Sequence, residues 1–358
     1  MTTPLFATPP DRVCILRLSA LGDVCHVLPV VRTLQDAWPQ CRITWILGTL
    51  EHRLLGQIPD IEFVTFDKKA GGAGHRELRQ RMAGRRFDAL LHMQLAFRAS
   101  LVAAQVPARV KLGYDRARAR ELQWVFTTHR IEPRQREHVQ DSLFGFAERL
   151  GLPRRRLRWD IPLSEAALVH ARRLIPDGRR TLVLSPCSSH APRNWSAERY
   201  AAVADHAASR HGLRVLICGG RSALELDYGA RIAALMREPC ENLVGKDTLP
   251  ELLATLARAT VLLSPDSGPA HMATTVGTPV VGLYAATNPA RSGPYLSRDW
   301  CVDRYDAAAR GFLGRPASDL AWTTKIERPG VMDLITVDDV IERLDALLAA
   351  GAPRTPTG

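Results

Sequence analysis

The sequence has no C-x-x-C pair, and no window of it approaches 18 uncharged apolar residues. Seven cysteines, an odd number and widely spaced, argue against a disulfide framework or a cysteine-based zinc site and favour free thiols in a reducing compartment. The missing apolar run predicts that no helix spans a bilayer. The first ten residues contain no Lys or Arg, so we expect no signal peptide and a cytoplasmic protein.

Aromatic residues are also scarce, at 6% of the chain, whereas 46% of its 358 residues are hydrophobic, enough for about two domains of ~150 residues. Charge is unevenly distributed. Residues 1–160 hold 26 Lys and Arg against 16 Asp and Glu, and residues 161–358 hold 22 against 21. We therefore expect the first half to meet an anionic partner, and its basic face could also rest against an anionic membrane surface.

Strand-like apolar runs alternate with helix-like segments, which predicts an α/β fold with parallel sheets. A domain boundary is expected between Trp159 and Leu174, where the charge imbalance ends and a second series of strands begins. Two α/β halves imply a ligand-binding cleft at the carboxyl ends of their strands. The tail at 352–358 is expected to fray. The expected strands are 13–18, 43–47, 61–66, 87–92, 181–185, 213–218, 260–264 and 279–284, and the expected helices are 23–38, 197–210, 222–236, 249–258, 269–276 and 337–350.

The first expected strand runs into the segment Leu-Ser-Ala-Leu-Gly-Asp, which ends at Asp23 and opens a helix. Two interpretations explain this acid about equally well: it caps the helix and complements its dipole, or it presents a carboxylate at the edge of the sheet. The segment is not a dinucleotide fingerprint, because it has one glycine where G-x-G-x-x-G needs three. An oxidoreductase is therefore disfavoured.

Three loops of the second half each follow an expected strand and could bind an anion. Serines, backbone N–H groups and an arginine in the first loop could hold phosphate oxygens, although an ordinary serine-rich loop explains it too. The second has a glycine pair, which is also common in plain turns. In the third, helix capping explains an Asp or a Ser but not the glycine and histidine beside them. The residues concerned are Ser188, Ser189 and Arg193 in the first loop, Glu225 after Gly219-Gly220 in the second, and Asp266, Ser267, Gly268 and His271 in the third.

These segments together resemble the family-nine glycosyltransferases, the ADP-heptose:lipopolysaccharide heptosyltransferases. The resemblance covers most of the chain and is carried by Arg-Leu-Ser-Ala-Leu-Gly-Asp at 17–23, Arg-Asn-Trp at 193–195, the Gly-Gly loop, Asp-Ser-Gly-Pro-Ala-His at 266–271 and Gly-Leu-Tyr-Ala-Ala-Thr-Asn-Pro-Ala-Arg-Ser-Gly-Pro-Tyr at 282–295. There are two departures. The family often has lysine where this chain has Arg193, and Asp-Thr-Gly where this chain has Asp-Ser-Gly. Both changes keep the chemistry of anion binding.

The resemblance implies the GT-B architecture, with two Rossmann-like domains facing across a cleft. Residues 1–165 would bind the acceptor, residues 166–335 the nucleotide sugar, and the helix within 336–358 would pack back on the first domain. It also implies an inverting transfer without a metal or other cofactor, with Asp23 as general base. The donor would be ADP-heptose, held by Ser188, Ser189, Arg193, Glu225, Asp266, Ser267, Gly268 and His271.

The acceptor implied by the resemblance is the anionic inner core of lipopolysaccharide, reached at the cytoplasmic face of the inner membrane. The excess of basic residues in the first half suits such an acceptor, although most single surface charges are simply solvated. We expect the acceptor site in the loops 67–76 and 111–120, with Ser19, Lys68, Lys69, Arg98, Lys111, Arg116, Arg118 and Arg120 as its candidates.

Two other function classes fit parts of the sequence. A nucleic-acid-binding protein would explain the isoelectric point of about 9.7, but it predicts aromatics among the basic residues, and residues 67–120 have few. A nucleotide-sugar epimerase or hydrolase could use the same two-domain fold, but it needs no large anionic acceptor surface. We therefore expect no nucleic-acid partner.

Overall fold

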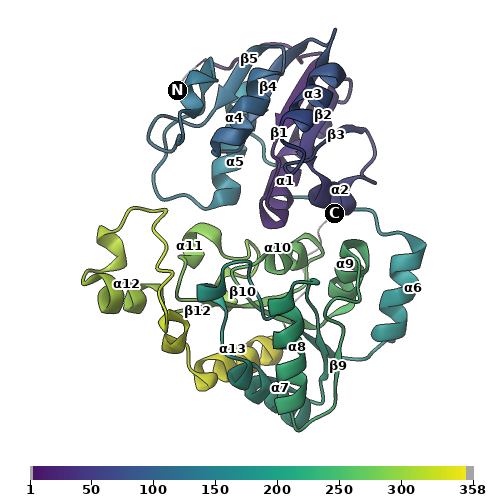
Figure 1. Cartoon of the computed structure of the whole chain (residues 1–358), viewed down its shortest axis with the longest axis vertical. Helices are drawn as coiled ribbons and strands as arrows, with labels where there is room; N and C mark the ends of the chain where they lie inside the picture. Colours follow the sequence, from purple (N-terminus) through teal and green to yellow (C-terminus); the bar gives the residue numbers. More distant parts are fainter. Residues whose placement is uncertain (1–2, 352–358) are drawn as a thin grey trace. The chain divides into compact units, whose positions relative to one another are not determined.

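The computed structural model describes residues 3–351, which form two compact units, one ending at Pro162 and the other beginning at Leu163 (Figure 1). Each unit contains a six-stranded sheet in which every pair of neighbouring strands is parallel. The α/β class expected from the sequence is confirmed. The expected tail at 352–358 lies outside the described residues.

The first unit has the strand order β3-β2-β1-β4-β5-β6. Its strands are β1 (Arg12–Leu16), β2 (Arg42–Gly48), β3 (Ile61–Phe66), β4 (Phe87–His92), β5 (Ala108–Gly113) and β6 (His129–Arg130). Its helices are α1 (Leu21–Ala37), α2 (Thr49–Leu55), α3 (Gly71–Met82), α4 (Phe97–Ala104), the short η1 (Gln123–Val125) and α5 (Val139–Leu150).

The second unit repeats this topology, with the order β12-β11-β10-β7-β8-β9. Its strands are β7 (Thr181–Leu184), β8 (Arg214–Ile217), β9 (Cys240–Asn242), β10 (Val261–Pro265), β11 (Val280–Tyr284) and β12 (Val302–Asp303). Its helices are α6 (Glu165–Leu174), α7 (Ala197–His211), α8 (Ala223–Leu235), α9 (Leu249–Arg258), α10 (Gly268–Thr275), α11 (Pro289–Ser292), α12 (Tyr305–Leu313) and α13 (Val337–Ala349), with η2 (Ala191–Arg193), η3 (Arg298–Trp300), η4 (Ala317–Asp319) and η5 (Val331–Leu334).

The central strands are buried because their sequences are continuously apolar. Val13 to Leu16 of β1 and Leu182 to Leu184 of β7 have no exposed surface. Such runs are typical of parallel strands covered on both faces. In both units the chain starts at a central strand, builds outward to one edge and then returns to build the other half, which is the doubly wound, Rossmann-like topology.

No strand or helix was expected between residues 113 and 160, but this arginine-rich region contains β6 and α5. The amphipathic face of α5 is formed by Leu143, Phe144, Phe146 and Leu150, all of them buried. Helix α5 itself holds one arginine, Arg149, and the other arginines of the region lie outside it, so the apolar period is short and is set among basic segments.

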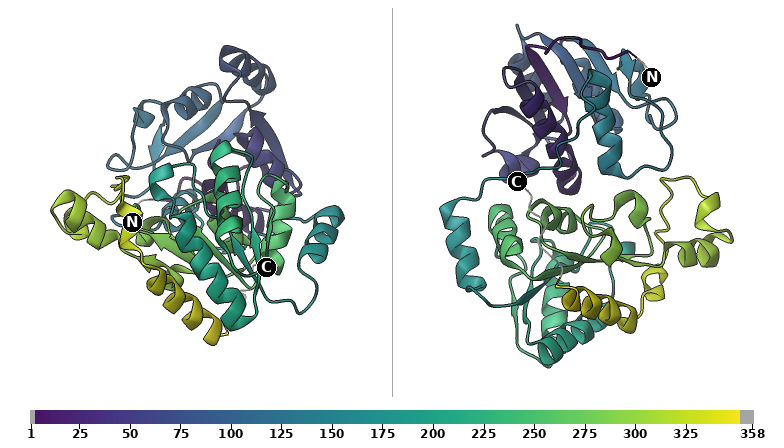
Figure 2. Two further views of the ribbon diagram at one scale, coloured as in Figure 1. Left: turned by 60° about the horizontal axis from the view of Figure 1, so that its bottom comes forward. Right: turned by 180° about the vertical axis from the view of Figure 1, so that it is seen from behind.

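The expectation that the terminal helix packs back on the first domain is wrong for Val337–Ala349. Helix α13 packs against α7, β11 and β12 within the second unit (Figure 2). Its apolar side chains Val340, Leu344 and Leu347 are buried in the same core as Leu182 and Tyr200. An amphipathic helix has one apolar face, and here the second unit covers it. Within residues 3–351 no helix is both long enough and apolar enough to cross a membrane.

Candidate functional site

The predicted polar loops lie at matching places in the two sheets. In each sheet the chain reverses its direction of building between two neighbouring strands, β1 and β4 in the first unit and β7 and β10 in the second. Open parallel sheets bind ligands at the carboxyl ends of the strands at this switch point. Asp23 follows β1, Ser188 follows β7, and Asp266 follows β10. The sheet topology therefore brings Ser188 and Asp266, 78 positions apart in sequence, to one edge.

Asp23 lies in the first turn of α1, whose N-cap residue Ala20 has no side chain able to cap it. The Ala20 backbone N–H donates to Asp23 Oδ2 at 3.0 Å. The same oxygen lies 2.5 Å from Arg17 Nη2, and a third of the Asp23 side chain is exposed. The capping interpretation is thus realised, and the carboxylate is also partly open at the carboxyl end of the sheet.

Arg17 was not singled out by the sequence, although it holds the Asp23 turn in place. Its Nε donates to the Ser19 carbonyl at 2.9 Å and its Nη1 to the Met93 carbonyl, just beyond β4. Burial acts to lower the pKa of Arg17, but the charge and hydrogen bond of Asp23, together with the charges of Tyr114 and Glu51, outweigh it and the pKa is raised. A cation at the end of a buried strand, directly before a small-residue turn, was the signal that could have identified it.

Two of the predicted acceptor residues, Lys68 and Arg98, are close enough to influence one another. Burial lowers the pKa of Lys68; Glu51 opposes this effect and the charge of Arg98 adds to it. Lys68 Nζ lies 3.7 Å from Glu51 Oε1, and the other carboxylate oxygen of the buried Glu51 has no hydrogen-bond partner among the described residues. Glu51 also raises the pKa of Arg17. Glu51 therefore acts electrostatically on both Lys68 and Arg17, and it is a residue that sequence reasoning missed.

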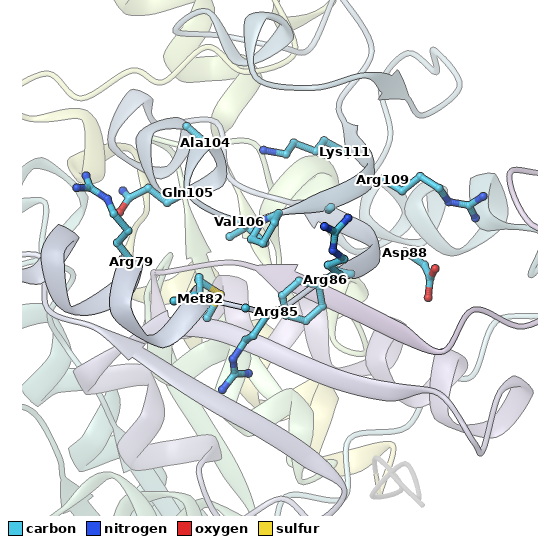
Figure 3. A pocket seen from close by; sticks show the side chains of 15 residues that line it. Arg79, Met82, Arg85, Arg86, Asp88, Ala104, Gln105, Val106, Arg109 and Lys111 are labelled. Atoms are coloured by element: carbon cyan, nitrogen blue, oxygen red, sulfur yellow. The ribbon is translucent and has the colours of Figure 1, made fainter.

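Lys111 lies elsewhere. It is on the wall of a pocket of about 1060 Å³ at the amino ends of β4 and β5, beside Arg79, Arg86 and Arg109 (Figure 3). Its Nζ donates to the Ala103 carbonyl at 2.9 Å, and burial lowers its pKa. Asp23 follows the carboxyl end of β1, whereas this pocket lies at the amino ends of β4 and β5, so the two are at opposite ends of the parallel strands.

The remaining basic candidates differ in their surroundings. Arg118 is held by Asp115, Glu137 and Ser142 and also donates to the Glu132 carbonyl, so its guanidinium organises the chain after β5. Lys69, Arg116 and Arg120 are exposed. Ser19 thus lies in the Asp23 turn, Lys68 interacts with Glu51 and Arg98, and Arg118 has a structural role.

Arg193 is the centre of the site in the second unit, with only 9% of its surface exposed. Its Nη1 lies 3.3 Å from Asp266 Oδ2, and its Nε and Nη2 donate to Glu327 Oε1 at 2.8 and 2.6 Å. His271 Nε2 lies 3.8 Å from Asp266 Oδ1. The Arg-Asn-Trp and Asp-Ser-Gly-Pro-Ala-His motifs are thus in direct contact.

The two carboxyl groups beside Arg193 are held ionised. Burial acts to raise the pKa of Asp266, but hydrogen bonding and charge from His271, together with the charge of Arg193, lower it. Burial likewise acts to raise the pKa of Glu327, and Arg193 lowers it. Lys325 is also close, and burial followed by the charge of Arg193 lowers its pKa. Glu327 and Lys325 were missed, because they lie in a loop without secondary structure or motif and reach the site only through the tertiary fold.

Helix α10 begins at this cluster without a side-chain cap. Helices α7, α8 and α9 each begin with a Ser or Thr hydroxyl that accepts a backbone N–H of the first turn. In α10 the N-cap Ser267 instead shares a hydrogen bond of 2.8 Å with Ser264, and Gly268 leaves the backbone uncovered. The start of α10 therefore presents N–H groups and the positive end of the helix dipole, which suits an anion.

The other two predicted donor loops follow β7 and β8, and the contacts of Glu225 lie within its own loop. The Ser188 N–H donates to Asn194 Oδ1 at 2.6 Å, which closes the loop onto the Arg-Asn-Trp segment, and Ser189 is exposed. Glu225 accepts from the Gly220 N–H at 2.7 Å and from the Ser222 hydroxyl at 2.6 Å. Glu225 therefore also shapes the glycine loop at the start of α8.

Sequence comparisons identify the family of the chain. The model of glycosyltransferase family 9 (heptosyltransferase) matches residues 75–311. The chain belongs to this family. Lipopolysaccharide core heptosyltransferase OpsX of Haemophilus influenzae is 42% identical to this glycosyltransferase over 344 residues, which is 96% of this chain and 99% of the relative. The family match contains every predicted donor residue, whereas Asp23 and Lys68 precede it.

Solved structures identify the fold of this glycosyltransferase as GT-B. The family 9 glycosyltransferase of Veillonella parvula has a TM-score of 0.77 and 23% identity, and covers 95% of this chain and 97% of its own. The ADP-heptose lipopolysaccharide heptosyltransferase II of Escherichia coli has a TM-score of 0.72 and 19% identity, and covers 96% and 100%. The GT-B fold implied by the sequence motifs is thereby confirmed.

Proposed function

We propose that this glycosyltransferase moves a heptose from ADP-heptose to the core region of lipopolysaccharide, with inversion at the anomeric carbon and without a metal. The observation that carries the proposal is the 42% identity to a lipopolysaccharide core heptosyltransferase over nearly the whole of both chains. The Escherichia coli enzyme with the same fold, which is named for ADP-heptose, supports the choice of donor.

The donor diphosphate would bind where β7 and β10 end. Arg193 supplies planar, paired N–H donors, and the uncapped start of α10 supplies backbone N–H groups. Asp266 and Glu327 hold the Arg193 guanidinium in place, so the guanidinium would need little reorganisation when the leaving diphosphate gains charge. In this arrangement Asp266 positions Arg193 and His271 rather than touching the anion, since carboxylate and phosphate repel one another. Ser188, Ser189 and Glu225 would complete the donor site.

Asp23 would act as the general base. The acceptor hydroxyl oxygen attacks the anomeric carbon from the face opposite the diphosphate, and a new C–O bond forms. The bond from that carbon to the phosphate oxygen breaks, and its electron pair leaves with ADP. The hydroxyl proton passes to the Asp23 carboxylate, which Arg17 orients. Attack from the opposite face is what inverts the configuration.

The acceptor would be held in the first unit. Ser19 lies in the Asp23 turn, and the neighbouring cations Lys68 and Arg98 have the chemistry to bind the carboxylates and phosphates of an anionic glycolipid. Such an acceptor would place the protein at the cytoplasmic face of the inner membrane, in peripheral contact with it. The remaining basic surface contributes long-range attraction.

The direct test is an assay of the purified protein with ADP-heptose and a set of truncated core acceptors, with products identified by mass and anomeric configuration. We expect heptose transfer to one truncated core and inversion at the new bond. A thermal-shift panel of ADP, UDP, GDP, NAD and a single-stranded oligonucleotide tests the donor separately. Stabilisation by ADP supports the proposal, whereas stabilisation by UDP alone would point to the epimerase or hydrolase alternative.

A further inference from the structure

Two histidines and one aspartate converge between α7 and α13, away from the residues assigned to transfer. His206 Nε2 lies 2.8 Å and His211 Nε2 lies 2.7 Å from the same oxygen, Asp345 Oδ1. The three ligand atoms all lie within 4.8 Å of one another. Among the described residues, His206, His211 and Asp345 thus form a group of potential metal ligands that is close enough to hold one ion.

The donor set is one that divalent zinc prefers. Imidazole nitrogen and carboxylate oxygen bind Zn²⁺ at about 2.0–2.2 Å, so ligand atoms around one ion stand roughly 3.3 Å apart in a tetrahedron. The two nitrogen-to-oxygen distances need to lengthen by about half an ångström, which side-chain rotation allows. The side chains are 24%, 22% and 40% exposed, so an ion can reach them from solvent.

The hydrogen bonds of the cluster are compatible with exchange for a cation. A carboxylate oxygen only accepts, so each ring donates its Nε2–H to Asp345 Oδ1. On binding, each ring moves that proton to Nδ1 or releases it to solvent, and the freed lone pair goes to the metal.

We propose that His206, His211 and Asp345 form a site for a divalent transition cation of the zinc type, with solvent in the fourth position, that joins α13 to α7. The site lies in the last part of α7, roughly 14–21 Å along the helix axis from the first residue at ~1.5 Å per residue. The donor loop ends just before that first residue. The ion is therefore structural, and transfer itself proceeds without it.

The consequence concerns the stability of the second unit. Helix α13 contributes Val340, Leu344 and Leu347 to the core, and an ion shared between α7 and α13 ties this terminal segment to the centre of the domain. A ligand that binds only the folded state stabilises it by mass action. At a hundredfold excess of ion over its dissociation constant, we expect the Tm to rise by roughly 5 °C or more.

The experiment measures Zn²⁺ binding to the purified, reduced full chain by competition with a chromogenic chelator, and Co²⁺ binding by its visible spectrum. The variants are His206→Ala, His211→Ala and Asp345→Asn. His170→Ala is the matched control, because His170 also contacts two carboxylates, Asp247 and Glu251, but belongs to no group of three metal-ligating side chains among the described residues. All variants are first compared by circular dichroism without metal, so that a folding defect is recognised.

We expect one Zn²⁺ per chain, a visible Co²⁺ spectrum of tetrahedral type without a thiolate charge-transfer band, and a Tm that rises with Zn²⁺. Each cluster variant should bind at least tenfold more weakly and lose the Tm response, while His170→Ala keeps both. Equal affinity in wild type and His211→Ala would overturn the proposal. A thiolate band would do the same, because the partly exposed Cys41 or Cys240 would then be the ligand.

Discussion

Arg17 Nη2 and Asp23 Oδ2 lie 2.5 Å apart, and this ion pair closes the turn between β1 and α1. Arg17 also binds the carbonyls of Ser19 and Met93, so one guanidinium links the ends of β1 and β4 at the switch point. The orientation of the Asp23 carboxylate is thus set before any substrate arrives. In such a site small displacements of the base reduce the rate far more than they reduce binding.

Replacing the carboxylate tests its role as base. Asp23→Asn keeps an oxygen for the Ala20 N–H but cannot accept a proton, so we expect the turnover to fall roughly 10²–10⁴-fold. Initial rates of heptose transfer measure the effect. Calorimetry with ADP is the control and should show unchanged affinity, since the proposed donor residues all lie in the second unit. Near-normal turnover would remove Asp23 from the base role.

Arg17→Lys tests positioning without removing charge. Lysine can still pair with Asp23, but it cannot also reach the carbonyls of Ser19 and Met93, because it lacks the fork of a guanidinium. We expect the kcat to fall roughly 10–100-fold with little change in the KM for ADP-heptose. Chemical denaturation should show that the free energy of unfolding falls by about 1–3 kcal/mol, because the Ser19 and Met93 carbonyls lose their hydrogen-bond donor. A normal kcat together with this loss of stability would mean that Arg17 only supports the fold.

Arg193 separates charge from geometry in the donor site. Arg193→Ala removes the proposed phosphate contact and the guanidinium that pairs with Asp266 and Glu327, so we expect ADP to bind roughly 10–100-fold more weakly. Arg193→Lys keeps a cation, and we expect a loss of less than about tenfold. Calorimetric titration with ADP measures both variants. Equal losses in the two would mean that paired guanidinium geometry, not charge, holds the diphosphate.

Acceptor binding is tested by comparing a double variant of Lys68 and Arg98 with a variant of Lys111, all in the first unit. We expect the double variant Lys68→Ala, Arg98→Ala to raise the acceptor KM about tenfold, because each exposed or half-buried charge contributes roughly 0.5–1 kcal/mol, and to weaken the salt dependence of KM. Lys111→Ala is the control, since Lys111 lines the pocket at the amino ends of β4 and β5 and its Nζ donates to the Ala103 carbonyl. An increase of KM in Lys111→Ala alone would move the acceptor site to the pocket of Figure 3.

His92, at the end of β4, predicts a dependence of stability on pH. Burial, with smaller effects from Arg17 and Lys111, lowers its pKa from 6.5 to about 3. The unfolded state therefore binds a proton that the folded state does not. Stability from this residue is complete above pH 6.5 and is lost progressively as the pH falls toward 3. We expect the free energy of unfolding, measured by chemical denaturation, to fall by about 2 kcal/mol more in wild type than in His92→Gln when the pH is lowered from 7 to 5. Equal losses would contradict the buried neutral imidazole.

The sequence predicted the elements that depend on local pattern. Strands 61–66 and 87–92 and helix 249–258 have the bounds expected, because their apolar periods are uninterrupted. It did not predict β5 or β9, which are partly exposed, or α5, which lies in an arginine-rich region. It also could not say which surface the apolar face of α13 would cover, since amphipathicity specifies a buried face but not its partner.

The same division holds for the site. Asp23, Arg193, Asp266 and His271 could be proposed from the sequence because they lie in short motifs within the loops and helix starts that follow strands, where the backbone brings them to the carboxyl ends of a parallel sheet. Only the tertiary structure decided the role of Glu327, which meets Arg193 from 134 positions away, and of Arg118, whose carboxylate partners make it structural. Charge and motif are local properties of a chain, whereas the partner that neutralises a charge is chosen by the fold.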